Sequence, residues 1–302
     1  MKHLLSIESL SRDEIYAVLE LAETKKAARG PGEEKPLDGQ CWALIFSKSS
    51  TRTRVSFEVG IREMGAQVMF LSAVDIQLGR GEPIEDTARV MGRMLNGAVI
   101  RTFEQKDVEL FAQHSGIPTI NALTDDEHPC QILSDLLTIR EKLGGVEGRT
   151  VGFVGDGACN VASSWIWAAA RLDFELRIAA PPHFQPDASL LKRVETQGRV
   201  RVFSDVKEAV HGSDVLYTDV WVSMGKEEES AFRLSQLAGY QINESLVARA
   251  NPGALVMHCL PAYRGKEITA ETFENHAQTL FDQAENRLHA QKAILQILAR
   301  HS

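Results

Sequence analysis

Residues 49–54, with the sequence Ser-Ser-Thr-Arg-Thr-Arg, combine hydroxyl groups and two guanidinium groups in one short segment. An apolar, strand-like run (41–46) precedes this segment, and a helix-like run (54–64) follows it. The first N–H groups of a helix have no partner inside the helix, and the helix dipole favours negative charge there. Hydroxyls add donors, and arginine presents a planar fork that matches phosphate. The segment therefore predicts a site for a phosphate-like anion.

This segment has two other interpretations. A Walker loop is excluded because the GxxxxGK[ST] glycines are missing. An ordinary Ser or Thr N-cap followed by solvated arginines remains an alternative, because such caps are common. Lys48 adds a further positive charge beside the segment.

Length and composition predict an ordinary globular enzyme of two domains. The chain has 302 residues, of which 44% are hydrophobic and 25% charged, and this length fits two domains of about 150 residues each. A net charge of −8 argues against nucleic acid and anionic membranes as partners. No apolar run approaches the ~18 residues of a membrane span, and no signal pattern is present. A positive site in an acidic protein suggests a small anionic ligand.

The four cysteines lie far apart in the sequence and form no CxxC pair. They are Cys41, Cys130, Cys159 and Cys259. This pattern is typical of reduced thiols in a cytosolic enzyme, so we expect a cytoplasmic location.

Short apolar runs alternate with longer amphipathic runs along the whole chain. Strands are predicted at 41–46, 67–71, 98–102, 119–121, 150–154, 176–180, 200–203, 215–218 and 255–259. Helices are predicted at 54–64, 84–95, 107–114, 129–143, 161–172, 188–196 and 206–211, with more after residue 225. Such alternation indicates an α/β fold whose parallel sheets are covered on both faces. Ligands of such sheets bind beyond the carboxyl ends of the strands.

The glycine-rich run at 144–148 predicts a domain boundary after a connecting helix at 129–143. One domain is expected at 1–143 and the other at 148–280. A final amphipathic run at 281–299 is expected to form a helix within 281–302 that packs back on the first domain.

Three further segments of the predicted α/β pattern carry polar groups suited to binding. Arg101 ends a strand, a position from which its side chain can reach the ligand crevice. A surface salt bridge is the alternative interpretation of this residue. His128 and Gln131 begin the connecting helix, with Pro129 at its favoured first position, and both can donate to a carbonyl group. A capping histidine with a solvated glutamine is the alternative. Asp219 and Ser223 follow the strand at 215–218. Asp219 suits an amine, and Ser223 suits a carboxylate or an amine. An ordinary loop with an acidic surface residue is the alternative.

The turn Gly155-Asp156-Gly157 gives only a weak dinucleotide signal. The third glycine is replaced by Asn160, and the next strand ends without the acid that binds a ribose. Asn160 at a helix start suits a polar ligand instead.

His258 and Cys259 end the last predicted strand, where alternation would place them on opposite faces. They are therefore expected not to form a nucleophile–base pair, and a buried structural cysteine is the alternative to ligand contact. No group of residues has zinc spacing, so no metal is predicted.

Together, these segments resemble the carbamoyltransferase (transcarbamylase) family over nearly the whole chain, and its ornithine branch in particular. The matching motifs are Ser-Thr-Arg-Thr-Arg (50–54), Arg101 with His-Pro-Cys-Gln (128–131), Ser-Met-Gly (223–225) and His-Cys-Leu-Pro (258–261). Residues 77–89 and 285–289 also fit.

The resemblance implies two α/β domains joined by two helices, a homotrimer with sites at subunit interfaces, and no cofactor. It implies carbamoyl transfer from carbamoyl phosphate to L-ornithine, most simply in arginine biosynthesis. The carbamoyl phosphate site would comprise Ser50, Thr51, Arg52, Thr53, Gln77, Arg101, His128, Gln131, Cys259, Leu260 and Arg287. The ornithine site would comprise Asn160, Asp219, Ser223 and Met224. The catalytic residues would be Arg101, His128, Cys259 and Asp219.

Three positions depart from the family pattern and concern the choice of amine. Cys159 stands where many relatives have Asn, Tyr263 where the branch usually has His, and Ser163 where Asn is frequent. The first alternative is therefore a carbamoyltransferase for another amine, such as putrescine or N-acetylornithine. Alternatives from other classes are a nucleotide-binding dehydrogenase, against which the missing glycine and acid count, and a non-catalytic carbamoyl phosphate sensor.

Overall fold

The computed structural model describes residues 1–72, 81–195 and 199–300. Its described residues form two compact units, each built on a parallel sheet with helices on both faces. The first unit contains Met1–Leu137 and Glu285–Ser302, and the second contains Thr138–Ala284. The predicted α/β fold with two parallel sheets is confirmed.

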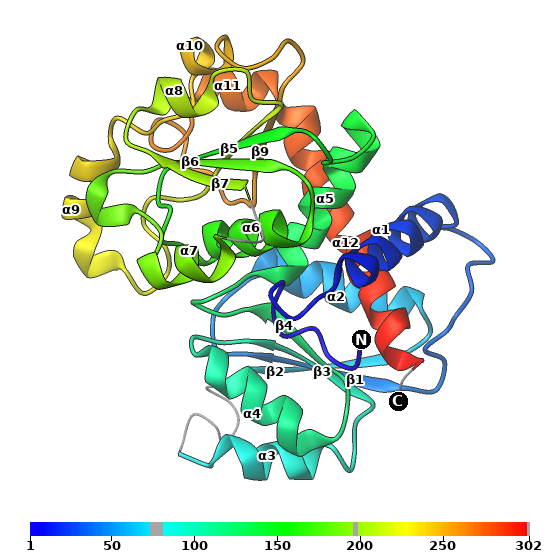
Figure 1. Ribbon diagram of the computed structural model, residues 1–302. Coiled ribbons are helices and arrows are strands. Elements are labelled where there is room, and N and C mark those ends of the chain that lie inside the picture. The colour runs from blue at the N-terminus through cyan, green and yellow to red at the C-terminus, as the bar shows by residue number, and fades with distance from the viewer. Residues whose placement is uncertain (73–80, 196–198, 301–302) are drawn as a thin grey trace. The chain divides into compact units, whose positions relative to one another are not determined.

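The first unit has a four-stranded sheet with the order β2-β1-β3-β4. Its strands are β1 (Cys41–Phe46), β2 (Gln67–Ser72), β3 (Gly97–Arg101) and β4 (Thr119–Leu123). Its helices are α1 (Arg12–Ala27), α2 (Thr51–Glu63), α3 (Ile84–Met91), α4 (Gln105–Ser115) and the first part of α5 (Pro129–Leu143). Helices α3 and α4 cover one face of the sheet (Figure 1), where Ala43, Ile45 and Ile100 pack against Val108 and Phe111.

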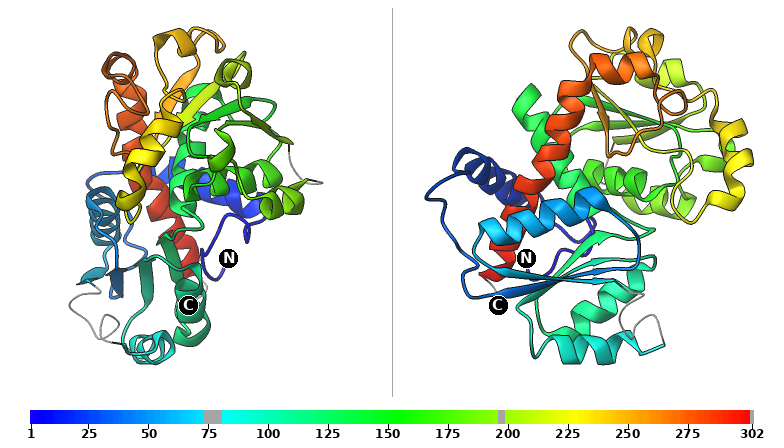
Figure 2. Two further views of the ribbon diagram at one scale, coloured as in Figure 1. Left: turned by 90° about the vertical axis from the view of Figure 1, so that its left-hand side faces the viewer. Right: turned by 180° about the vertical axis from the view of Figure 1, so that it is seen from behind.

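Helices α1, α2 and the last part of α12 (Ala277–Ala299) cover the opposite face of this sheet, as the rear view in Figure 2 shows. Lys292 of α12 is fully buried and pairs with Glu33 at 2.5 Å and with Glu63 of α2 at 2.9 Å. A buried charge is tolerated when it is paired in this way. The pairs therefore fasten α12 to the first unit.

The second unit has a five-stranded sheet with the order β7-β6-β5-β8-β9. Its strands are β5 (Thr150–Val154), β6 (Glu175–Ala179), β7 (Arg199–Phe203), β8 (Val215–Thr218) and β9 (Leu255–His258). Its helices are α6 (Asn160–Arg171), η2 (Pro182–Phe184), α7 (Ala188–Val194), α8 (Val206–Val210), η3 (Glu227–Glu229), α9 (Ser230–Leu237), α10 (Glu244–Val247) and α11 (Ala270–Asn275). Helices α6 and α7 lie on one face, and α8, α10 and α11 on the other (Figure 1).

The chain passes from the first unit to the second inside α5, between Leu137 and Thr138, and returns inside α12, between Ala284 and Glu285. Both helices therefore contribute residues to both units. The glycine-rich run after α5 adopts left-handed backbone at Gly144, Gly145 and Gly148, which glycine favours because it has no Cβ.

Helix α1 is the main element that the sequence analysis did not predict. Its N-cap Ser11 accepts a hydrogen bond from the Glu14 N–H at 3.2 Å, and the Glu14 carboxylate accepts one from the Ser11 N–H at 3.0 Å. This capping box is visible in the sequence as Ser-x-x-Glu.

Candidate active site

The first unit places its polar residues where the strand order reverses. Strands β1 and β3 are neighbours, and the chain leads from them toward opposite edges of the sheet. A ligand crevice forms beyond the carboxyl ends of the strands at such a point. Phe46 pairs with Arg101 at these ends, and the Ser47 N–H donates to the Arg101 carbonyl at 2.8 Å. The loop into α2 and the end of β3 therefore adjoin.

The hydroxyl-rich segment forms the start of α2, as predicted. Ser50 is the N-cap and accepts a hydrogen bond from the Thr53 N–H at 3.3 Å. Thr51 is exposed, Arg52 is half-buried and Thr53 is fully buried. From α12, Arg287 Nη2 donates to Thr53 Oγ1 at 2.5 Å. This contact joins the two sequence-distant segments that the resemblance assigns to carbamoyl phosphate.

His128 lies in the same electrostatic environment as Arg101 and Arg287. Burial, then the positive charges of Arg287 and Arg101, hold the pKa of His128 well below its usual value. The imidazole is therefore neutral at neutral pH. His128 directly precedes α5, and its carbonyl accepts the Gln131 N–H at 3.0 Å.

Arg52 Nε and Gln131 Oε1 are examples, in this region, of polar atoms buried without a hydrogen-bond partner among the described residues. The other amide atom of this glutamine, Gln131 Nε2, donates to Asp135 Oδ1 at 2.8 Å. Buried polar atoms of this kind are rare in native structures and call for a partner such as a ligand or water.

Lys48, the further positive charge beside the segment, has partners in the fold. Its ammonium group pairs with Asp125 and lies 4.2 Å from the centre of the Phe103 ring. Gln77, another residue assigned to carbamoyl phosphate, lies outside the described residues.

The second unit repeats the topological arrangement with different chemistry. Its strand order reverses between β5 and β8. Asn160 is the first residue of α6 after β5, and Asp219 follows β8 directly. Ser223 is half-buried and Met224 exposed in the segment after Asp219. All four residues assigned to ornithine therefore follow the two central strands.

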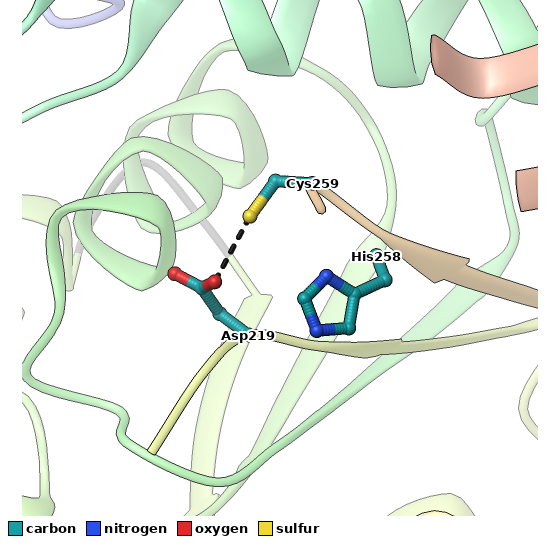
Figure 3. A group of neighbouring side chains, drawn as sticks. All are labelled: Asp219, His258 and Cys259. Atoms are coloured by element: carbon teal, nitrogen blue, oxygen red, sulfur yellow. Dashed lines mark hydrogen bonds between the residues drawn. The ribbon is translucent and has the colours of Figure 1, made fainter. Parts of the chain in front are cut away.

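Cys259 contacts Asp219, as Figure 3 shows. The Cys259 thiol donates to Asp219 Oδ1 at 2.9 Å, and the buried carboxylate also accepts the Val220 N–H at 2.7 Å. Strand β9 ends at His258, so Cys259 and Leu260 lie in the loop beyond it. The alternation argument for His258 and Cys259 therefore fails, because alternation applies only within a strand.

His258 supports this loop and is bonded through both ring nitrogens. Nδ1 accepts the Leu260 N–H at 2.8 Å, so the ring proton is on Nε2, which lies 3.2 Å from Glu267 Oε1. Leu260 has a φ of 57°, a left-handed conformation that is strained for a residue with a side chain. The histidine thus holds the backbone beside Cys259.

Ligand atoms of Asp219, His258 and Cys259 lie within 4.8 Å of one another and could hold a metal ion. A metal on His258 would have to replace one of its two hydrogen bonds. The absence of a resident metal stays a prediction.

The sequence analysis missed two residues that support the site. Glu267 has no recognisable spacing from His258, and only the fold brings them together. Arg233 pairs with Asp156 at 2.7 Å, and its sequence signal is limited to Glu229 four residues earlier, the N-cap residue of α9.

No helix in the described part of the chain combines the length and apolar character needed to cross a membrane.

Family models match both halves of the chain. The aspartate/ornithine carbamoyltransferase carbamoyl-P binding domain matches residues 2–141, and the Asp/Orn binding domain of the same family matches residues 147–298.

Full-length relatives agree with these matches. The chain is 56% identical over 301 residues to the ornithine carbamoyltransferase of Akkermansia muciniphila, covering 99% of this chain and 98% of that protein. It is 52% identical over 300 residues to the ornithine carbamoyltransferase of Methanothermobacter thermautotrophicus, covering 98% of each.

Solved structures show the same fold. The anabolic ornithine carbamoyltransferase from Campylobacter jejuni matches with a TM-score of 0.94 and 38% identity over 100% of both chains. The enzyme from Pyrococcus furiosus matches with a TM-score of 0.93 and 41% identity, over 100% of this chain and 98% of that one. The resemblance seen in the sequence is confirmed, and the chain belongs to the aspartate/ornithine carbamoyltransferase family.

Proposed function

We propose that this protein transfers the carbamoyl group from carbamoyl phosphate to the δ-amine of L-ornithine, giving L-citrulline and phosphate. The observation that carries this proposal is the pair of unlike sites at the two topological switch points. One is lined by guanidinium groups and the other by Asp219 and Cys259. Full-length similarity to proteins named ornithine carbamoyltransferase supports the same substrates.

The first unit suits carbamoyl phosphate. Arg52 and the start of α2 would hold the phosphate, because guanidinium forks and free helix N–H groups bind such anions. Arg101, neutral His128 and the Thr53 hydroxyl would donate to the carbamoyl oxygen and stabilise the charge that develops there. Gln131 and Arg287 would complete this site, with Ser50, Thr51 and Gln77 as further contacts.

The second unit suits the amino acid. Asp219 would attract the δ-amine, while Asn160, Ser223 and Met224 would hold the rest of L-ornithine. A free alkyl amine has a pKa of about 10.4, so it must lose a proton before it can attack. Asp219 and Cys259 would orient the amine and favour this proton loss. Cys259 and Leu260 would also contact the carbamoyl group.

The reaction needs no covalent enzyme intermediate. The neutral amine nitrogen forms a bond to the carbamoyl carbon, and the bond from that carbon to the phosphate oxygen breaks. The nitrogen then gives up a proton to solvent or to the departing phosphate. Catalysis would consist of positioning and electrostatic stabilisation, without cofactor or metal.

Domain roles, assembly and location are part of the same proposal. Residues 1–143 with 281–302 would bind carbamoyl phosphate, and residues 148–280 would bind ornithine. We propose a homotrimer. The support is exposed apolar surface on the first unit: Met69 of the edge strand β2 is 47% exposed, and Val55 of α2 is 54% exposed. Edge strands with apolar side chains are commonly covered. The described cysteines form no disulfide, which favours the cytoplasm, where arginine biosynthesis would use the product.

The deciding experiment measures ureido product from carbamoyl phosphate and a panel of amines. The panel contains L-ornithine, putrescine, N-acetyl-L-ornithine, L-aspartate and L-lysine. We expect a strong preference for L-ornithine. Preference for another amine would overturn the ornithine assignments, and carbamoyl phosphate binding without turnover would favour a sensor. Sedimentation of the purified protein at three chain masses would support the trimer.

A further inference from the structure

The second unit contains a buried ion pair that the proposed chemistry does not use. Arg233 Nη1 of α9 donates to Asp156 Oδ2 at 2.7 Å, and the two side chains are only 10% and 6% exposed. Asp156 lies in the turn between β5 and α6, where it also accepts the Ala158 N–H at 3.0 Å. Taking two charges out of water costs free energy, so the pair needs a reason beyond stability.

The same guanidinium group makes contacts in three further directions. Nη1 lies 3.4 Å from the Trp221 carbonyl oxygen, and Nε donates to Glu229 Oε2 at 2.9 Å. Its central carbon lies 4.9 Å from the centre of the Phe184 ring. Trp221 and Phe184, which this group contacts, form one buried apolar cluster with Leu237. The planar group is therefore fixed on several sides, and a lysine could not reproduce its fork.

The two segments that Arg233 joins are the two that carry the ornithine residues. Asp156 precedes Asn160 in the β5–α6 turn, and Trp221 lies between Asp219 and Ser223 in the segment after β8. Position errors of about 1 Å at a reacting group can cost on the order of 100-fold in rate. A group that ties these segments together would set the spacing of the amino-acid site.

We propose that Arg233 and Asp156 act as positioning residues for the ornithine site, by holding the segment after β8 against the β5–α6 turn. This inference rests on the proposed function. It predicts that disturbing the pair weakens the use of ornithine and leaves carbamoyl phosphate binding unchanged. The described contacts of the pair, with Ala158, Phe184, Trp221 and Glu229, all lie in the second unit.

Asp156→Asn is the most informative variant. The amide has nearly the same shape, and Arg233 keeps Glu229 as a charged partner, so the fold should survive. Arg233→Gln would leave the Asp156 carboxyl buried beside Asp219. Burial already raises the pKa of Asp156, Arg233 opposes that rise, and Asp219 adds to it. The arginine variant would therefore mix two effects, whereas Arg233→Lys keeps the charge and removes only the fork.

The matched control is Glu229→Gln. Glu229 bonds the same guanidinium group, but its side chain is 50% exposed, and the bond stays within the α9 region. The four single variants, the double variant Asp156→Asn with Arg233→Gln and the wild type are assayed for kcat, for KM of both substrates and for thermal midpoint.

We expect Asp156→Asn and Arg233→Lys each to raise KM for ornithine by roughly tenfold or more, because each weakens a charged hydrogen bond. In these two variants, KM for carbamoyl phosphate should stay within about twofold of the wild-type value. In Glu229→Gln, KM for ornithine and KM for carbamoyl phosphate should both stay within about twofold, because exposed ion pairs contribute little. Because the two residues act through one another, the double variant Asp156→Asn with Arg233→Gln should be no worse than the poorer of the single variants Asp156→Asn and Arg233→Gln.

An unchanged KM for ornithine in folded Asp156→Asn, or equal changes in both KM values, would overturn the inference and leave the pair a purely structural contact. A lowered thermal midpoint with normal kinetics would do the same. If the wild type makes no citrulline in this assay, the proposed function fails instead, so the two failures are distinguishable.

Discussion

In the first unit the strand order reverses between β1 and β3, and the residues gathered there are three arginines and a neutral histidine. In the second unit it reverses between β5 and β8, and the residues there are a carboxylate, a thiol and an amide. The two units share a topology and differ in charge. The topology thus provides a binding position in each unit, while the side chains decide which ligand it takes.

The two sites also differ in the interactions among their own residues. In the first unit, Arg101 and Arg287 act on His128 with charges of the same sign, and they lower its pKa together with burial. A bound anion would reduce the repulsion between these positive charges. In the second unit, Asp219 is held by the thiol of Cys259 and the N–H of Val220 and is suited to a cation.

Arg52→Lys would change the first unit most strongly. We expect kcat to fall by on the order of 100-fold, because lysine cannot make the bidentate contact to the leaving phosphate. Arg54→Lys is the matched control, since Arg54 is exposed and pairs with Glu58 on the helix surface. Steady-state citrulline formation measures both variants, and near-wild-type kcat in Arg52→Lys would remove Arg52 from the site.

Asp219→Asn would test the second unit alone. Loss of the negative charge should lower kcat/KM for ornithine by roughly 10- to 100-fold, as expected for a hydrogen bond to a charged group. The equilibrium affinity for carbamoyl phosphate, measured by calorimetry without ornithine, should not change. Asp214→Asn at the opposite end of β8 is the control. A weakened carbamoyl phosphate affinity in Asp219→Asn would contradict the separation of the two sites.

The pH dependence of the reaction should distinguish the use of the amine substrate from the binding of carbamoyl phosphate. At low ornithine concentration, we expect the rate to rise by up to about tenfold per pH unit above neutrality, because the neutral amine becomes more abundant below its pKa of about 10.4. KM for carbamoyl phosphate should change far less. A flat profile between pH 7 and 9 would show that amine deprotonation does not limit the rate.

His128 should make stability depend on pH in a predictable direction. Its pKa in the folded protein is well below the ordinary 6.5, so below pH 6.5 the unfolded chain binds a proton that the folded chain does not. The free energy of unfolding should therefore fall on acidification, with a slope of up to about 1.4 kcal/mol per pH unit from this residue.

Urea denaturation of the wild type and His128→Gln between pH 7.5 and 5 measures this contribution. The variant should lose less stability over that range. The exposed His211→Gln is the control and should follow the wild type. Parallel curves for all three proteins would mean that His128 is not held neutral by the fold.

Much of this architecture is predictable from local sequence. Strands β1, β5 and β8 have the predicted bounds, because buried parallel strands are short apolar runs between turn residues. Helix α3 is shorter than predicted and ends at Met91, and α1 was missed although its capping box is present. Boundaries of this kind depend on packing as well as on the local pattern.

The candidate site is predictable only in part. Motifs named its residues, but the neutral state of His128 depends on burial and on Arg287, far away in the chain. The contact between Cys259 and Asp219 depends on β8 and β9 being neighbours. The ion pair of Lys48 could not be predicted, because Asp125 approaches it only in the fold.

The sequence by itself determined the α/β class, the family and the chemical types present at each site, because these depend on periodicity and on motifs within short segments. The tertiary structure decided which charges neutralise each other, which histidine nitrogen carries a proton and which thiol meets a carboxylate. Those properties depend on distances of a few ångströms between segments up to 234 residues apart, as for Thr53 and Arg287. Only packing of the folded chain fixes such distances.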